Sequence, residues 1–250
     1  MRSDRANVSE IFISFQGEGV HAGRRQLFIR FGGCPLRCRY CDTPESLTPA
    51  ATCRILGADG GRERPNPLSV DDLVAEVATL RAQSAPLHAI AVTGGEPLQQ
   101  SEFLAAWLAR AGGDLPVLLE TAGIWPERLQ AVLPWVAIVS LDFKCPSNTG
   151  ERARWDEHEA CLRAAVGARR AVYVKMPVDE ETAPEEIERG ARLVAATGPH
   201  VPLFLTPLSE PRTPALTVSV PTLERQHALA SRHHPDVRVL PQLHKVLGIP

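Results

Sequence analysis

The chain has 250 residues, a net charge of −2 and 44% hydrophobic residues, enough for one large α/β domain or two small ones. A net charge of −2 provides no overall positive charge that would attract nucleic acid or anionic lipid. No apolar run approaches the ~18 residues that are needed to cross a bilayer. Six cysteines and an amino terminus without the pattern of a signal peptide favour a cytoplasmic protein with free thiols. The expected ligand is a small molecule.

Short apolar runs alternate along the chain with amphipathic stretches. The apolar runs predict strands, and they are rich in Val, Ile, Leu and Phe on both faces, as doubly covered parallel strands are. Predicted strands cover 27–31, 89–93, 117–120, 136–141, 171–176, 203–206 and 237–240. Predicted helices cover 70–83, 101–111, 156–166, 184–197 and 221–233.

This alternation predicts a parallel sheet covered by helices. The number of strands favours an α/β fold of the partial or modified (β/α) TIM-like barrel type over a flat sheet, with chemistry at the carboxyl ends of the strands. Residues 44–68 break the pattern with closely spaced prolines and glycines, which predicts an inserted loop or hairpin. We see no linker, so we expect a single domain over residues 1–250.

Three cysteines follow the first predicted strand within eight residues: Cys34, Cys38 and Cys41. Three thiolates on one loop can hold three irons of a cubic 4Fe-4S cluster, which leaves a fourth iron open to a small molecule. A zinc site needs a fourth protein ligand, and Cys53 or His21 could supply it, although neither has the usual spacing.

The other cysteines have a simpler interpretation. Cys53, Cys145 and Cys161 are separated along the chain and are interpreted as buried structural thiols. A disulfide framework suits short secreted chains, and this chain is long.

Two further strand ends carry candidate ligand-binding groups. Gly94 and Gly95 have no Cβ and allow close approach to a ligand, and the Glu96 carboxylate can accept from an ammonium group. An ordinary strand-to-loop turn would also use two glycines. The polar residues of 140–144 suit a ribose or a carboxylate, but could equally be a strand-end cap and a solvated lysine.

The Cys-x3-Cys-x2-Cys loop and the later Gly-Gly-Glu-Pro run resemble the radical S-adenosylmethionine (SAM) superfamily. The resemblance implies that the open iron binds the amino and carboxylate groups of SAM. It also implies a set of SAM contacts, of which those in 140–144 and at 206 depart from the usual pattern: Tyr40, Asp42, Gly94, Gly95, Glu96, Ser140, Asp142, Lys144 and Thr206.

Segments near both ends of the chain are more specific. Residues 10–19, 30–34, 41–43 and 240–250 closely resemble the 7-carboxy-7-deazaguanine synthase family of queuosine biosynthesis. That family converts 6-carboxy-5,6,7,8-tetrahydropterin to 7-carboxy-7-deazaguanine with a 4Fe-4S cluster, SAM and Mg²⁺. The implied mechanism is hydrogen abstraction from C6 by a deoxyadenosyl radical, ring contraction and loss of ammonia.

The resemblance also implies residue roles. Gln16 and Glu18 would bind the N–H and carbonyl edge of the pterin, and Arg30 its carboxylate. Thr43 would be a Mg²⁺ ligand, although before a proline it could also be a turn residue. Pro250, the last residue, would contact the substrate in this family. Without the family resemblance, a terminal proline would be interpreted as part of a frayed tail. The implied substrate contacts are Phe15, Gln16, Gly17, Glu18, Arg30, Thr93, His244 and Pro250.

The family further implies an electron donor such as flavodoxin or ferredoxin, and a homodimer. Two alternatives stay open. A radical SAM activase that acts on a partner protein's glycine would share the cysteine loop, but not the motifs near the two ends. A non-enzymatic regulator that binds zinc or an iron–sulfur cluster would need a fourth protein ligand and would not cleave SAM.

Overall fold

The computed structural model describes residues 4–57, 60–111, 113, 115–210 and 213–250. Within these ranges ten strands form one sheet in the order β12-β11-β10-β9-β8-β7-β3-β2-β4-β5. Their bounds are β2 (Val8–Phe15), β3 (Arg25–Phe31), β4 (Thr52–Gly57), β5 (Gly60–Pro65), β7 (Ala89–Gly94), β8 (Val117–Thr121), β9 (Ile138–Asp142), β10 (Ala171–Val178), β11 (Leu203–Pro207) and β12 (Val237–Val239). A separate pair joins β1 (Arg5–Ala6) to β6 (Leu68–Ser69).

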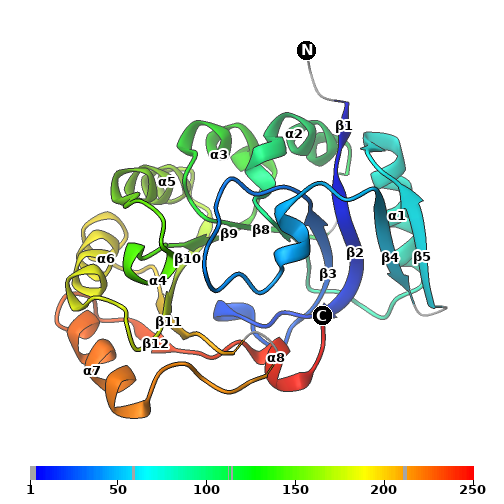
Figure 1. Ribbon diagram of the computed structural model, residues 1–250. Coiled ribbons are helices and arrows are strands. Elements are labelled where there is room, and N and C mark those ends of the chain that lie inside the picture. The colour runs from blue at the N-terminus through cyan, green and yellow to red at the C-terminus, as the bar shows by residue number, and fades with distance from the viewer. Residues whose placement is uncertain (1–3, 58–59, 112, 114, 211–212) are drawn as a thin grey trace.

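Seven neighbouring strands, from β3 and β7 through β12, run parallel. Strand β2 runs antiparallel to β3, and β4 pairs in parallel with β2 and antiparallel with β5. The sheet curves strongly, with the cysteine loop and the carboxyl-terminal segment on its inner side (Figure 1). This arrangement confirms the predicted partial barrel.

The longer helices cover the outer side of the sheet (Figure 1). The longer ones are α1 (Val70–Ala82), α2 (Ser101–Arg110), α3 (Pro126–Val132), α5 (Trp155–Gly167), α6 (Pro184–Thr197) and α7 (Val220–Ser231), and the short ones are α4 (Pro146–Thr149) and α8 (Leu243–Leu247). Helix α1 begins with a capping box, because Ser69 Oγ accepts from Asp72 N–H at 3.1 Å and Asp72 accepts from Ser69 N–H at 3.0 Å. None of the described helices is long and apolar enough to cross a membrane.

Alternation along the strands separates the core from the inner face. Leu27 and Ile29 of β3 pack with Leu104 and Trp107 of α2 in the main core. Phe28, between them in sequence, points to the opposite face. The inner face of the sheet is therefore free to carry ligand-binding groups.

Two features of the fold were not predicted as strands or helices. Strand β2 lies in a segment that we interpreted only as a family motif, and α3 lies between two predicted strands. Residues 44–68 contain the 3-10 turn η2 (Pro44–Leu47) and the β4–β5 hairpin. The hairpin extends the sheet beyond β2, which makes it part of the wall of the barrel.

Candidate active site

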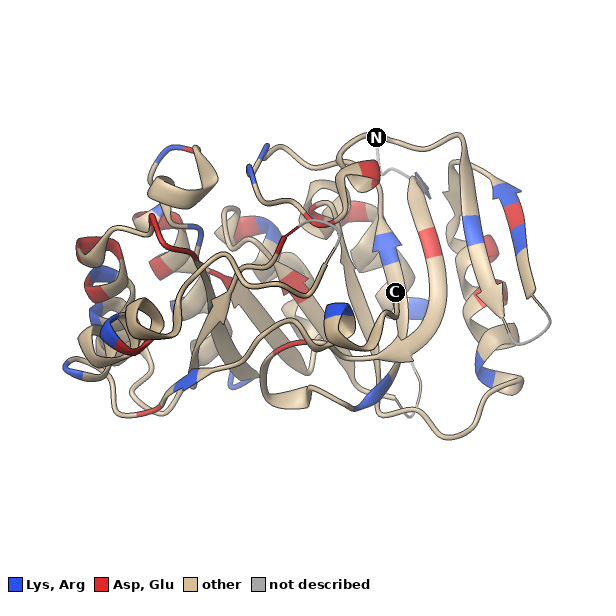
Figure 2. Ribbon diagram, turned by 60° about the horizontal axis from the view of Figure 1, so that its bottom comes forward, with Lys and Arg blue, Asp and Glu red and all other residues tan. Residues whose placement is uncertain are grey.

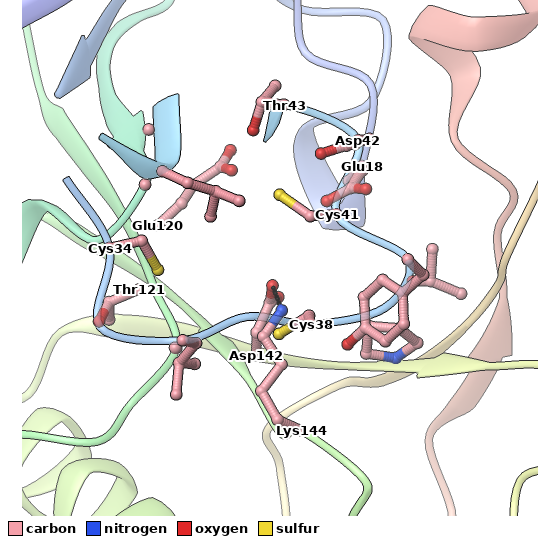
Figure 3. Close-up of a pocket in the computed structure, with 18 of the residues that line it drawn as sticks. Glu18, Cys34, Cys38, Cys41, Asp42, Thr43, Glu120, Thr121, Asp142 and Lys144 are labelled. Carbon is pink, nitrogen blue, oxygen red and sulfur yellow. Dashed lines mark hydrogen bonds and ion pairs between the residues drawn. The ribbon is translucent and has the colours of Figure 1, made fainter. Parts of the chain in front are cut away.

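The three clustered cysteines line one cavity on the inner side of the sheet, and Figure 3 shows their sulfur atoms around it. Backbone hydrogen bonds hold both ends of the loop. Gly33 N–H donates to Ser46 at 2.8 Å, Cys34 N–H to Leu47 at 3.2 Å and Cys41 N–H to Cys38 at 3.1 Å. The turn η2 thus holds the cysteine loop in place.

The alternative fourth ligands lie elsewhere. Cys53 is buried in the core on β4. The centre of the His21 ring lies 4.6 Å from that of His88. Neither Cys53 nor His21 lines the cysteine cavity. Cys145 and Cys161 are buried as expected. No three His, Cys, Asp or Glu side chains in the described ranges converge on a point suited to a single metal ion. The three thiols line one cavity, and cysteine thiolates are the ligands that hold iron–sulfur clusters.

The paired glycines bring the end of β7 against the start of the cysteine loop. A Cβ on Gly94 would lie 2.3 Å from the Phe31 carbonyl oxygen, and one on Gly95 would lie 2.3 Å from that of Gly33. Gly94 also has a φ of +130°, a conformation that favours glycine. Both glycines line the cavity, so their backbone faces any ligand there.

Glu96 is more deeply buried than the two glycines before it. Its side chain is fully buried and does not line the cavity. The carboxylate accepts from Leu98 N–H at 3.0 Å, Thr121 Oγ1 at 2.8 Å and Ala122 N–H at 2.7 Å. Burial raises its pKa despite these hydrogen bonds. Glu96 therefore joins two strand-end loops, and Oε2, which accepts only the bond from Ala122, keeps one further acceptor site.

The segment at the end of β9 contributes only in part as predicted. Ser140 is fully buried and does not line the cavity, although it shares a face of β9 with Asp142, because it lies two residues further from the carboxyl end of the strand. Asp142 and Lys144 do line the cavity, and they form an ion pair with 2.8 Å between Lys144 Nζ and Asp142 Oδ2. Lys144 Nζ also lies 5.5 Å from the centre of the Tyr40 ring. Thr206 lines the same cavity.

Lys175, which the sequence interpretation missed, lies buried among three carboxylates. Its Nζ contacts Glu18 and lies 3.2 Å from Asp142 and 3.8 Å from Glu120. Burial would lower the lysine pKa, but Asp142, Glu18 and Glu120 together hold it well above its usual value. The charged lysine therefore fixes carboxylates that come from three different strand ends.

A second cavity, of about 460 Å³, opens beside the first. It is lined by all eight residues predicted to contact the substrate: Phe15, Gln16, Gly17, Glu18, Arg30, Thr93, His244 and Pro250. The structure thus brings together residues from β2, β3, β7 and the carboxyl-terminal segment.

Hydrogen bonds orient the polar groups of this second cavity. Gln16 Nε2 donates to Glu120 at 2.8 Å, and Thr93 Oγ1 donates to the same carboxylate at 3.2 Å. The Gln16 side-chain oxygen accepts from Glu18 N–H at 3.1 Å. Glu120 is the last residue but one of β8, so the rule that chemistry gathers at the carboxyl ends of strands could have found it.

The carboxyl-terminal segment closes over the loop after β2. Leu243 N–H donates to the Gly17 carbonyl at 2.9 Å, and a Cβ on Gly17 would lie only 2.2 Å from His244 Nδ1. Gln242 Nε2 donates to Glu18 and to Asp42, each at 2.9 Å. Gln242 thereby joins the two cavities, a role that its place in the family segment 240–250 did not reveal.

Five residues line both cavities and form a wall that we call the shared wall: Glu18, Asp42, Thr43, Gly94 and Glu120. Burial would raise the pKa of Asp42, but the hydrogen bond and charge of His244, with Lys245 and Arg30, lower it below its usual range. Ser46 Oγ donates to the Thr43 carbonyl at 2.8 Å and lies 3.2 Å from Thr43 Oγ1.

The chain is similar to known proteins over almost its whole length. Residues 28–200 match the radical SAM superfamily. A Geobacter sulfurreducens protein named 7-carboxy-7-deazaguanine synthase is 40% identical over 99% of both chains, and one of that name from Methanopyrus kandleri is 34% identical over 96% of this chain and 93% of its own. The crystal structure of QueE from Escherichia coli aligns with a TM-score of 0.58 and 19% identity, over 96% of this chain and 95% of that one. With its cysteine loop and glycine turn around one cavity, the chain belongs to the radical SAM superfamily and, within it, to the 7-carboxy-7-deazaguanine synthase family.

Proposed function

We propose that this chain converts 6-carboxy-5,6,7,8-tetrahydropterin to 7-carboxy-7-deazaguanine with loss of ammonia. The observation that carries the proposal is the pair of cavities with a shared wall. One is lined by the three cysteines and the other by polar groups suited to a pterin. The full-length relatives with this activity in their names support the same assignment.

The cysteine cavity has the donor set of a three-thiolate 4Fe-4S cluster beside backbone that can approach a small molecule. The cluster and SAM, when bound, supply the radical that abstracts hydrogen from carbon. Gly94 and Gly95 would present backbone groups to the amino-acid part of SAM, and the Asp142–Lys144 pair and Tyr40 would lie against its remainder. Glu96 would act indirectly, since it holds the loop that carries Thr121 and Ala122.

The second cavity would orient the pterin. The Glu18 carboxylate, which contacts Lys175 and is held by Gln242, can accept two N–H groups from the pterin edge. The side-chain oxygen of Gln16 can accept from the same edge, whereas its amide nitrogen already donates to Glu120 at 2.8 Å and to Gln26 at 3.2 Å. Arg30 would bind the substrate carboxylate in a planar fork.

Thr43 is proposed as a Mg²⁺ ligand. It lies on the shared wall, where the hydrogen bond from Ser46 Oγ to the Thr43 carbonyl at 2.8 Å fixes its backbone, and its hydroxyl oxygen carries lone pairs for a cation. Magnesium keeps several waters and takes few protein ligands, so one hydroxyl beside a substrate carboxylate suits it. A flavodoxin or ferredoxin as electron donor and a homodimer stay predictions from the family resemblance.

The test is anaerobic turnover. The reconstituted enzyme receives dithionite, SAM, Mg²⁺ and the carboxytetrahydropterin, and mass spectrometry detects the deazaguanine product. We expect product from wild type and none from Cys38→Ala. Cleavage of SAM without deazaguanine would refute the pterin assignment and favour an activase. Neither reaction, with zinc bound in place of iron, would favour the regulator.

A further inference from the structure

The inserted hairpin places a second arginine beside the one predicted to bind the substrate carboxylate. Glu10 on β2 pairs in register with Arg30 on β3 and with Arg54 on β4. Residues opposite one another on adjacent strands share a face of the sheet, so the three form one row. Figure 2 shows an acidic band on β2 between basic bands on its two neighbours. All three residues line the second cavity, which is the larger of the two.

The next row along the same face is apolar. Phe12 pairs in register with Phe28 and with Leu56, and the two phenylalanine rings stack at 5.0 Å with 7° between their planes. This row also lines the cavity, about 7 Å from the charged row because it is two residues further along each strand. A flat ring can lie over the apolar row while an anionic substituent reaches the charged row.

The charged row keeps an excess of positive charge. Glu10 accepts from Arg30 at 2.6 Å and from Arg54 at 2.8 Å, so one carboxylate serves two guanidinium groups. Its side chain is 7% exposed, whereas that of Arg54 is 54% exposed. Arg54 is therefore held from below by Glu10 and still presents N–H donors toward the cavity.

We propose that Arg54 is a second binding residue for the substrate carboxylate, and thus a residue that makes the enzyme specific for anionic pterins. The proposal rests on the proposed function and deepens it. It also gives the inserted hairpin a role, because β4 supplies both Arg54 and Leu56 to the cavity. A carboxylate can accept from two guanidinium groups at once, which strengthens its binding relative to a neutral group of similar size.

The experiment compares two fluorescent pterins that differ in one charge. The reconstituted enzyme, without reductant, is titrated with 6-carboxypterin and with neutral 6-hydroxymethylpterin, and dissociation constants are read from the fluorescence. We expect Arg54→Gln to raise the dissociation constant of 6-carboxypterin about fivefold. This factor is the upper end of the affinity change expected from losing a half-exposed ion pair. The affinity for 6-hydroxymethylpterin should stay unchanged, and Arg54→Lys should restore part of the loss.

The matched control is Arg62→Gln on the other strand of the hairpin. Arg62 is 48% exposed and pairs with Glu76, itself 7% exposed, but it does not line the larger cavity. It should leave both affinities unchanged. The inference is wrong if Arg54→Gln binds 6-carboxypterin as wild type does, if it weakens both pterins equally, or if Arg62→Gln has the same effect. A wild-type enzyme that binds neither pterin would overturn the proposed function, and this inference with it.

Discussion

Replacing Lys175 by methionine keeps the length of the side chain but removes the charge that lies among Glu18, Asp142 and Glu120. Replacing a whole buried ion pair by apolar groups is often neutral, but removing one partner alone costs ~3–5 kcal/mol because a buried charge loses its counter-ion. Here each carboxylate keeps another donor; Asp142, for example, keeps Lys144. We therefore expect the lower end, about 3 kcal/mol.

This loss is measurable as a change in unfolding temperature. At ~2–4 °C per kcal/mol for a chain of this size, the melting temperature should fall by about 6–12 °C at neutral pH. Circular dichroism of the metal-free protein during heating gives the value. Lys245→Met is the control, because this lysine is less buried and we expect a loss below about 1 kcal/mol.

The pH dependence of the loss separates a charge effect from a packing effect. The pKa of Asp142 is lowered in the folded state, although burial opposes this, mainly by Lys144 and Lys175. Its contribution to stability is thus present above the unfolded pKa and is lost as pH falls through the folded one. The pKa of Lys175 is raised, so its contribution persists until alkaline pH. The difference between wild type and Lys175→Met should stay constant from about pH 5 to about pH 10 and should shrink in acid below about pH 4. A difference under about 0.5 kcal/mol at pH 7, or one that does not change in acid, would refute the reasoning.

Three other changes test other parts of the site. Gly95→Ala should lower the iron bound per chain, because its Cβ would lie 2.3 Å from the Gly33 carbonyl oxygen and push the cysteine loop away. Gly17→Ala should weaken 6-carboxypterin binding and leave the iron content unchanged, because its Cβ would lie 2.2 Å from a ring nitrogen of His244. Burial lowers the pKa of His158 to about 4, so the stability of wild type should fall by about 3 kcal/mol between pH 6.5 and pH 4. His158→Gln should remove that slope in urea unfolding.

Each of these changes has a clear contrary result. Gly167→Ala is the control for both glycine variants, since its Cβ would meet nothing within 4 Å. Normal iron content in Gly95→Ala, or lost iron in Gly17→Ala, would contradict the assigned contacts. For His158, the ring accepts from Lys144 N–H at 3.1 Å and lies 3.1 Å from the Gly123 carbonyl, which fits a neutral ring with its proton on Nδ1. An unchanged acid slope in His158→Gln would show that other groups cause it.

Much of the fold could be predicted because its strands are apolar on both faces. All seven predicted strands are confirmed within a few residues, and helix α6 has the predicted bounds 184–197. Strand β2 was missed because its side chains serve both the core and a polar cavity, so that Ile11 alternates with Glu10 and Phe12 without a simple polar period.

The candidate site was less predictable, since motifs identify residues but not the direction of their side chains. Glu96 and Ser140 lie in recognised segments, yet both are fully buried away from the cavity. Lys175, in contrast, lies in no recognised motif, but its position in the sequence could have identified it. A lysine within an apolar parallel strand implies buried counter-ions, and the three strand-end carboxylates were the obvious candidates. Arg54 could not have been found, because only the register of the hairpin with β2 places it beside Glu10.

The shared wall has a thermodynamic consequence. Residues such as Glu18 and Glu120 face both cavities, so a ligand in one cavity changes the charge and the order that the second ligand meets. The two binding free energies are therefore linked, and whatever factor SAM contributes to pterin affinity, the pterin must contribute to SAM affinity. A carboxylate already fixed by the first ligand costs less conformational entropy to the second, which favours positive cooperativity. The protein would thus hold both reactants together more often than their separate affinities imply.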